Sequence, residues 1–255
     1  MNLEEILKDK QGAIQMKKAQ VKHADVSITP QLRNGVTSKS VIEKQDVDSI
    51  TKTIVGNTYY YLDSHEDLHV KGVFTKTIKE RSDRIFHLHD HEFKLTAKVG
   101  EPQDIYEKDV SWKELGVNAD GMTVALFMDT EIMKDYNSQI FDLYNKGEIN
   151  QHSVGMQYHK IELAVNSDKE ELKIEKETWD KYYPLVLNKN DADKLGYMWI
   201  VKEASLIEIS AVLLGSNPIT PTIESKEEPS NHSKSNNDPA DKVTGEEKFI
   251  NKLKS

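Results

Sequence analysis

The spacing of apolar residues predicts a series of β-strands from about residue 48 onward. Residues 54–62 are rich in Ile, Val and Tyr, which favour strands, and Gly56-Asn57 interrupts the run as a bulge or a turn would. Residues 63–68 are typical of a turn, and a helix that ends near residue 80 is predicted after it. Further strands are predicted at residues 85–99, 121–128, 151–165 and 204–214.

The clearest helical pattern lies between residues 131 and 147. Its apolar side chains fall on one face at helical spacing: Ile132, Tyr136, Ile140, Leu143 and Tyr144. Thr130 is a suitable N-cap, and Gly147 suits the C-terminal stop. We therefore expect one long amphipathic helix directly before the strand at 151–165.

The first 47 residues are polar and differ in composition from the middle of the chain. They contain a short apolar stripe at helical spacing, formed by Leu3, Ile6, Leu7 and Ile14. Pro30 and Asn34-Gly35 then break the pattern. The stripe predicts either a solvated arm with one short helix or a helix that docks on another protein.

The end of the chain has the composition of a disordered tail. Residues 225–242 contain no large apolar side chain, so they cannot bury enough surface to offset their ordering entropy. Residues 249–253 form a short amphipathic segment beyond them. The expected organisation is an N-terminal arm at 1–47, one domain at 48–222 and a C-terminal tail at 223–255.

Composition and charge narrow the class of protein. The chain has 255 residues and a formal net charge of −9, which disfavours nucleic acid as the main partner because phosphate binding needs clustered Lys and Arg. It has no cysteine, which excludes disulfides, zinc–thiolate sites and cysteine nucleophiles. No apolar run approaches the roughly 20 residues that span a bilayer, and the charged N-terminus is unlike a secretory signal. We expect a cytosolic protein without a membrane partner.

Three histidines at a spacing of two, His87, His89 and His91, form a first candidate site. On a regular strand all three would point to one face and could hold a metal ion, because neutral imidazole is a common ligand for Zn²⁺. The stretch resembles the His-x-His-x-Asp-His motif of metallo-β-lactamase-type enzymes but lacks the residue between the second His and the Asp. A metal-dependent hydrolase using these three residues is one alternative, and a structural or surface His cluster is another.

His89, Ser153 and Glu208 form a second candidate site in that chain order. A serine hydroxyl is a poor nucleophile unless an imidazole takes its proton and a third group orients that imidazole. Gly155 permits the close approach of a substrate backbone, whereas His152 points to the opposite face of a regular strand. Glu208 lies in an apolar run and is expensive to bury unless paired, so it orients an imidazole, is exposed at a sheet edge or is bridged to a Lys.

Four motifs occur in order along the middle of the chain. They are Asp63 with residues 67–74, Leu88-His89-Asp90, residues 153–156 (Ser-Val-Gly-Met), and residues 206–212 (Leu-Ile-Glu-Ile-Ser-Ala-Val) with Asn217-Pro218. By these motifs, residues 51–218 resemble the prohead (procapsid maturation) serine proteases of tailed bacteriophages, which are similar in fold and mechanism to herpesvirus assemblin.

The resemblance implies a mainly β (α+β) fold, a small closed or partly open β-barrel with flanking helices as in assemblin. It implies a serine endopeptidase without a cofactor, in which His89 is the general base, Ser153 the nucleophile, and Glu208 the third member or a structural neighbour. The implied partners are the major capsid protein and the scaffold of the procapsid, with the chain's own ends as further substrates and self-association as a further interaction. The implied location is the assembling procapsid in the host cytoplasm.

The match departs from the family at two places. The residues before His89-Asp90 are mixed rather than strongly apolar, which leaves His87 and His91 as alternative bases. Gly215-Ser216 stands before Asn217 where the family more often has Pro-Ala, and this is expected to alter the loop rather than the chemistry. A non-catalytic capsid assembly protein, whose arms bind capsid subunits, is a further alternative.

Overall fold

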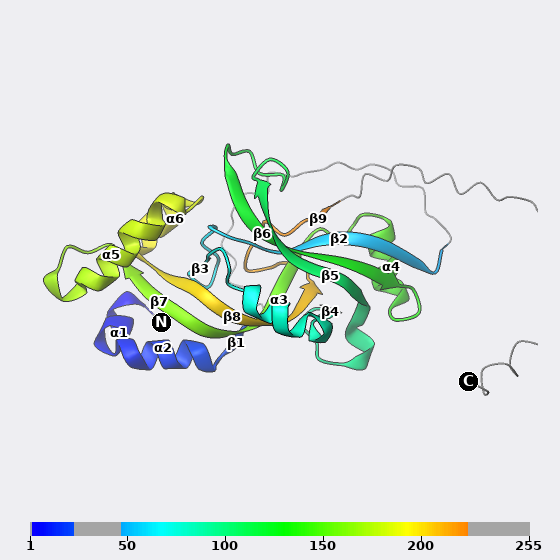
Figure 1. The fold of residues 1–255 in the computed structure, drawn as a ribbon, viewed down its shortest axis with the longest axis horizontal. Coiled ribbons are helices and arrows are strands. Elements are labelled where there is room, and N and C mark those ends of the chain that lie inside the picture. The colour runs from blue at the N-terminus through cyan, green and yellow to red at the C-terminus, as the bar shows by residue number, and fades with distance from the viewer. Residues whose placement is uncertain (1, 23–46, 224–255) are drawn as a thin grey trace, which may run out of the picture. The chain divides into compact units, whose positions relative to one another are not determined.

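A mixed β-sheet is the main element of the fold (Figure 1). The computed structural model describes residues 2–22 and 47–223. Within them the hydrogen-bonded order is β1-β7-β8-β4-β5-β6-β2-β9, and β3 pairs with β8 outside this path. The strands are β1 (Val21–Lys22), β2 (Ser49–Thr58), β3 (Asp67–His69), β4 (Phe86–His89), β5 (Lys98–Ser111), β6 (Met122–Met133), β7 (His152–Val165), β8 (Tyr197–Ala211) and β9 (Thr222–Ile223).

Short helices flank the sheet. The α-helices are α1 (Leu3–Lys8), α2 (Lys10–Ala19), α3 (Thr75–Arg81), α4 (Ser138–Asn145), α5 (Lys173–Tyr182) and α6 (Lys189–Leu195). The 3₁₀ turns are η1 (Ser82–Arg84), η2 (Leu95–Ala97), η3 (Glu170–Leu172) and η4 (Tyr183–Leu185). Within the described ranges, no helix combines the length and the apolar character needed to cross a membrane.

The described sheet is open rather than a closed barrel. Its hydrogen-bonded path ends at β1 on one side and at β9 on the other. The sheet nevertheless curls, because β2 contacts β7 and a Cβ on Gly56 of β2 would lie 2.6 Å from the side chain of Ile209 in β8. The expectation of strands with flanking helices is thus confirmed in part: the described fold is mixed α and β with a large, mostly open sheet, and these strands do not form a small closed barrel.

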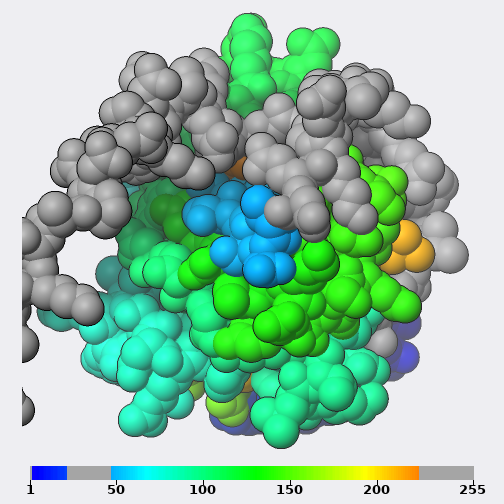
Figure 2. Space-filling view, turned by 90° about the vertical axis from the view of Figure 1, so that its right-hand side faces the viewer, coloured from blue at the N-terminus to red at the C-terminus, as the bar shows by residue number. Residues whose placement is uncertain are grey.

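Helices cover the sheet at both ends of the β7–β8 pair (Figure 1). At one end, Phe141 and Tyr144 of α4 enter the main core of the sheet. At the other end, α5 and α6 bury Trp179 and Ala192 in a smaller cluster with Met198. In the space-filling view, the first residues of β2 (blue) lie beside the green atoms of the β6–α4 region (Figure 2).

The expected helix at 131–147 is wrong over its first half. Strand β6 continues to Met133, and α4 begins only at Ser138. Ile132 lies fully buried in that strand, opposite Ile50 of β2, so sheet pairing overrides the helical spacing of the apolar residues. The N-cap is therefore Asn137, whose side chain accepts from the N–H of Ile140, and not Thr130.

The other expected elements agree better with the structure. The interruption at Gly56-Asn57 is confirmed as a register shift in β2. The stretch 85–99 is not one strand, because β4 ends at His89 and a turn leads to β5. The last long strand, β8, begins earlier than the expected residue 204 and ends at Ala211.

Residues 2–22 contain two helices rather than one, and both pack on the chain's own sheet. Ile6 of α1 and Ala13 of α2 belong to the main core. Lys17 of α2 pairs with the buried Asp67 at 2.7 Å. The expected breaks at Pro30 and Asn34-Gly35 lie outside the described residues. So does the tail expected at 223–255, with its segment 249–253, apart from Ile223, which lies in β9.

Candidate active site

The antiparallel pair β7–β8 sets the position of Ser153. In its register Ser153 lies opposite Ser210, and Gly155 lies opposite Glu208. Because residues two apart on a strand share a face, and directly opposed residues lie on the same face, these four residues line one face of the sheet. The sheet therefore brings Ser153 and Glu208 together, although they are far apart in the sequence.

Gly155 leaves room for the Glu208 carboxylate. A Cβ built on Gly155 would lie 2.0 Å from Oε1 of Glu208, so any side chain at this position would force the carboxylate to move. The glycine after Ser153 thus lets the carboxylate lie flat over β7. Gly155 thus provides space for the Glu208 side chain, in addition to the substrate access that the sequence suggests.

Glu208 is fully buried and has two side-chain partners. Its Oε1 lies 2.5 Å from Nδ1 of His91, and its Oε2 accepts from the Ser210 hydroxyl at 2.6 Å. The Ser210 Oγ in turn accepts from the backbone N–H of His91 at 3.1 Å. The carboxylate, the imidazole and the hydroxyl form one connected group, which offsets the cost of burying a charge.

A tight turn brings His91 to this face. Asp90 and His91 both have positive φ, 51° and 54°, and the N–H of Glu92 bonds the carbonyl of His89 at 3.1 Å. Two successive left-handed residues are typical of a type I′ turn, and outside Gly this conformation is most frequent for Asn, Asp and His, as at Asp90 and His91. Backbone strain of this kind gathers at functional sites, and here it reverses the chain directly beyond β4.

The imidazole that pairs with Glu208 is therefore His91, not His89. His89 is the last residue of β4 and is in register with Ala211. Its side chain therefore lies on the other face of the sheet from Glu208 and Ser210. Its Nδ1 lies 3.0 Å from Oδ2 of Asp90 at the surface. The expectation that Glu208 pairs with an imidazole holds, but the strand on which the three histidines were aligned ends before His91.

The pairing fixes the proton of His91. An ionised carboxylate only accepts hydrogen bonds, so Nδ1 of His91 carries the hydrogen that Glu208 accepts. In the neutral ring Nε2 is then the basic nitrogen. This is the tautomer that a general base needs when a carboxylate orients it from behind.

His87 and His152 belong to the core on the opposite face. The Tyr144 hydroxyl lies 3.1 Å from Nε2 of His87 and 2.9 Å from Nε2 of His152. Nδ1 of His152 lies 2.8 Å from the carbonyl of Thr220, and Nδ1 of His87 lies 3.1 Å from Oγ1 of Thr130. The expected orientation of His152, away from Ser153, is thus confirmed.

This chain of hydrogen bonds has one consistent direction. The Thr220 carbonyl can only accept, so His152 donates from Nδ1 and accepts the Tyr144 hydrogen at Nε2. Tyr144 then accepts from Nε2 of His87, and Nδ1 of His87 accepts from Thr130. Burial lowers the pKa of His87 to about 3 and that of His152 to about 4, so both rings are neutral.

The three-histidine metal site is not assembled. Both ring nitrogens of His87 are engaged in the core, His89 lies with Asp90, and His91 lies with Glu208 on the other face. Among the described residues, a group that could hold a metal ion by its spacing is Asp63, Asp67 and His69. There Lys17 already places its ammonium 2.7 Å from Asp67.

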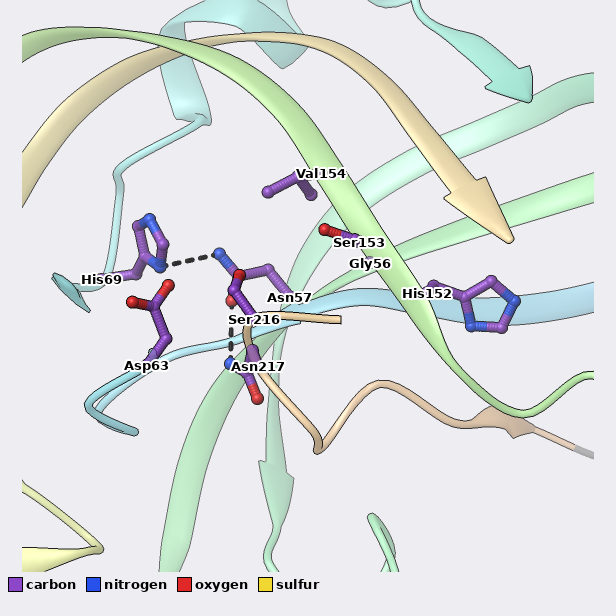
Figure 3. A pocket seen from close by; sticks show the side chains of 9 residues that line it. All are labelled: Gly56, Asn57, Asp63, His69, His152, Ser153, Val154, Ser216 and Asn217. Carbon is purple, nitrogen blue, oxygen red and sulfur yellow. Dashed lines mark hydrogen bonds between the residues drawn. The ribbon is translucent and has the colours of Figure 1, made fainter. Parts of the chain in front are cut away.

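A small cavity of about 10 Å³, room for about one water molecule, borders Ser153 (Figure 3). Figure 3 shows Ser153 and His152 extending from opposite sides of β7, with Asn57, His69 and Asn217 on the Ser153 side. Asn57 Nδ2 lies 2.9 Å from Nδ1 of His69, and Asn217 donates to Oδ1 of Asn57 at 3.0 Å. This polar network borders the same cavity as Ser153.

Sequence reasoning missed several members of the site. Ser210 and Asn57 were not singled out, and His69 and Asn217 appeared only inside motifs. His91 was named only as an alternative base. The signal for Asn217 was the Asn-Pro ending of the fourth motif. Ser210 lies in the same motif two residues after Glu208, a spacing that places both on one face of a regular strand.

Comparisons of the chain with family models, with curated proteins and with solved structures gave no match.

Proposed function

We propose that the chain is a serine endopeptidase in which Ser153 is the nucleophile, His91 the general base and Glu208 the group that orients it. The observation that supports this best is the buried Glu208–His91 pair, at 2.5 Å, on the face of β7–β8 that also bears Ser153. A buried carboxylate needs a partner, and this one holds an imidazole in the tautomer of a base.

The proposed reaction is acyl transfer. His91 takes the Ser153 proton at Nε2 as Oγ attacks the scissile carbonyl, and it then returns the proton to the leaving amine. Glu208 holds the imidazole and stabilises the imidazolium, while water later hydrolyses the acyl-enzyme. Catalytic hydrogen bonds are often long without substrate and shorten in the complex, so substrate binding is expected to bring Ser153 and His91 together.

Ser153 fits the nucleophile better than Ser210. The Ser210 hydroxyl is fully buried, donates to Glu208 and accepts from the His91 backbone. Ser153 is 6% exposed and stands in the Ser-Val-Gly motif. Ser210 therefore acts as a support for the carboxylate.

Among serine endopeptidases, the ordered motifs favour a prohead maturation protease with an assemblin-like, partly open barrel. Substrates are then scaffold segments and capsid-protein arms, and the partners are the procapsid scaffold and the major capsid protein, inside the assembling shell in the host cytoplasm. The chain's own ends are further substrates. This part of the proposal is supported by the resemblance of residues 51–218.

A fluorophosphonate label followed by peptide mapping tests the nucleophile. We expect labelling at Ser153 in the wild type, none there in Ser153→Ala, and normal labelling in the matched variant His89→Ala. Cleavage of procapsid proteins by Ser153→Ala should fall on the order of 10⁴-fold or more, because the members of a triad act as a unit.

The choice of base is tested in the same assay. His91→Ala should match the loss in Ser153→Ala, whereas His89→Ala should retain most activity. A full loss in His69→Ala with normal activity in His91→Ala would instead assign the base to the imidazole at the small cavity. A folded wild type that neither labels nor cleaves would favour the non-catalytic assembly protein.

A further inference from the structure

Arginine is rare in this chain, and two arginines line one pocket. Lys and Arg together number 34, and Arg33, Arg81 and Arg84 are the arginines among them. Arg81 and Arg84, at the end of α3 and in η1, border a pocket of about 280 Å³. Its lining is completed by Gln157, Ser205, Leu206 and Ile207. Apart from Arg33, the other 31 of these 34 basic residues are Lys, so two guanidinium groups at one pocket are distinctive.

The pocket lies on the same face of the sheet as Ser153. Gln157 follows the alternation of Ser153 and Gly155 along β7. Its partner in register on β8 is Ser205, beyond the register shift between Gly155 and Met156. Gln157 lies four positions along β7 from Ser153, which is about 13 Å at roughly 3.3 Å per residue. An extended peptide held at Ser153 would reach the pocket with a residue three to five positions from the scissile bond.

The pocket is suited to an anion. No carboxylate is among its lining residues. The nearest acidic residue along β8, Glu208, is engaged by His91 and Ser210. Glu80 and Asp83 belong to the same segment as the arginines and are exposed to solvent. A guanidinium presents a planar fork of donors that matches a carboxylate, and Gln157 adds a further amide.

We propose that Arg81 and Arg84 form a specificity subsite for an Asp or Glu side chain of the peptide substrate, three to five residues from the scissile bond. The inference rests on the proposed peptidase function for its substrate, and it adds the chemistry of that substrate: an acidic peptide. Leu206 and Ile207 would contact the methylene groups of the bound side chain.

A defined synthetic peptide library, read by mass spectrometry, compares the wild type with the double variant Arg81→Gln/Arg84→Gln. For the wild type we expect cleaved peptides to carry Asp or Glu three to five residues from the cut. For the double variant we expect kcat/KM for these peptides to fall at least ~10-fold, with Gln-substituted peptides unchanged. Lys79→Gln, the loss of one positive charge on an exposed turn of α3, is the matched control.

A second measurement keeps the subsite testable without turnover. Labelled hexaglutamate should bind Ser153→Ala at low salt more tightly than hexaglutamine, and the arginine double variant should abolish the difference. Cleavage without any preference for acidic residues, or hexaglutamate binding that is unchanged by the double variant, would overturn the subsite and leave the peptidase intact. Absence of all cleavage alongside Arg-dependent hexaglutamate binding would overturn the peptidase and leave the anion site. Inorganic phosphate that competes as well as hexaglutamate would show a general anion site and overturn the assignment to a peptide side chain.

Discussion

At the scale of single residues, the candidate site depends on the absence of a side chain at Gly155 and on the hydrogen-bond partners of Glu208. The carboxylate occupies the space that any Cβ at position 155 would need. It then binds an imidazole and a hydroxyl at once. A glycine, a glutamate and a histidine from three separate elements are thus mutually dependent.

Gly155→Ala should therefore damage the site and the fold together. We expect overpacking to lower the free energy of unfolding by about 1–3 kcal/mol, and displacement of Glu208 from His91 to lower turnover by ~100-fold or more. Denaturant unfolding and peptide cleavage measure the two effects. In the double variant Gly155→Ala/Glu208→Ala the clash is removed, so much of the stability should return without activity. Equal stability of Gly155→Ala and wild type would contradict the tight fit.

Glu208→Gln tests whether the carboxylate orients the base. An amide keeps the shape but can present its NH₂ to Nδ1 of His91, which places the ring in the wrong tautomer. We expect turnover to fall on the order of 10³–10⁴-fold, with a shifted lower limit of the pH–rate profile and little change in unfolding. An unchanged pH–rate profile with reduced stability would instead give Glu208 a purely structural role.

At the scale of elements, the turn between β4 and β5 decides which histidine faces Ser153. Asp90 and His91 both adopt left-handed backbone conformations. A spacing of two places histidines on one face only while the strand continues. Because β4 ends at His89, this prediction does not extend to His91. The sequence pattern therefore predicted β7 and the second half of β8, because these depend on alternation, whereas it left open whether Glu208 is buried or exposed. It could not predict the turn, which depends on local backbone geometry, or the end of β6, which depends on pairing with β2.

Two substitutions at Asp90 separate backbone conformation from side-chain chemistry. Both Asp90→Gly and Asp90→Val remove the contact with His89, but only glycine accepts positive φ without strain. We expect Asp90→Gly to retain activity, whereas Asp90→Val should lose about 1–3 kcal/mol of stability and ~100-fold in turnover as His91 shifts. Equal effects of the two variants in both assays would show that the turn geometry does not position the base.

At the scale of the whole molecule, the core between α4 and the sheet is built on neutral histidines. His87 and His152 share the Tyr144 hydroxyl, and burial holds their pKa values at about 3 and about 4. In the unfolded chain both rings titrate near 6.5, the ordinary value. Below that pH the unfolded state binds protons that the folded state excludes, so acid favours unfolding.

The free energy of unfolding should accordingly be constant above about pH 7 as far as these groups are concerned. It should fall between pH 6.5 and 4, by up to about 1.4 kcal/mol per pH unit for each histidine. Urea unfolding across this range measures the slope. His87→Gln removes one titrating ring and should reduce the slope, while His89→Gln at the surface serves as the control. Equal slopes for wild type and His87→Gln would contradict a neutral, buried His87.

The pairing of Lys17 with Asp67 has a consequence for the integrity of the chain. The ammonium reaches a buried carboxylate and lies over the rings of Tyr158 and Trp199, at 5.4 Å and 5.5 Å from their centroids. Together with Ile6 and Ala13 in the core, these contacts make residues 2–22 a ligand that the rest of the domain binds in cis. A backbone break between positions 22 and 47 would then produce two fragments held together by non-covalent contacts. The apparent size of the native protein would stay the same, whereas denaturing electrophoresis would separate the two fragments.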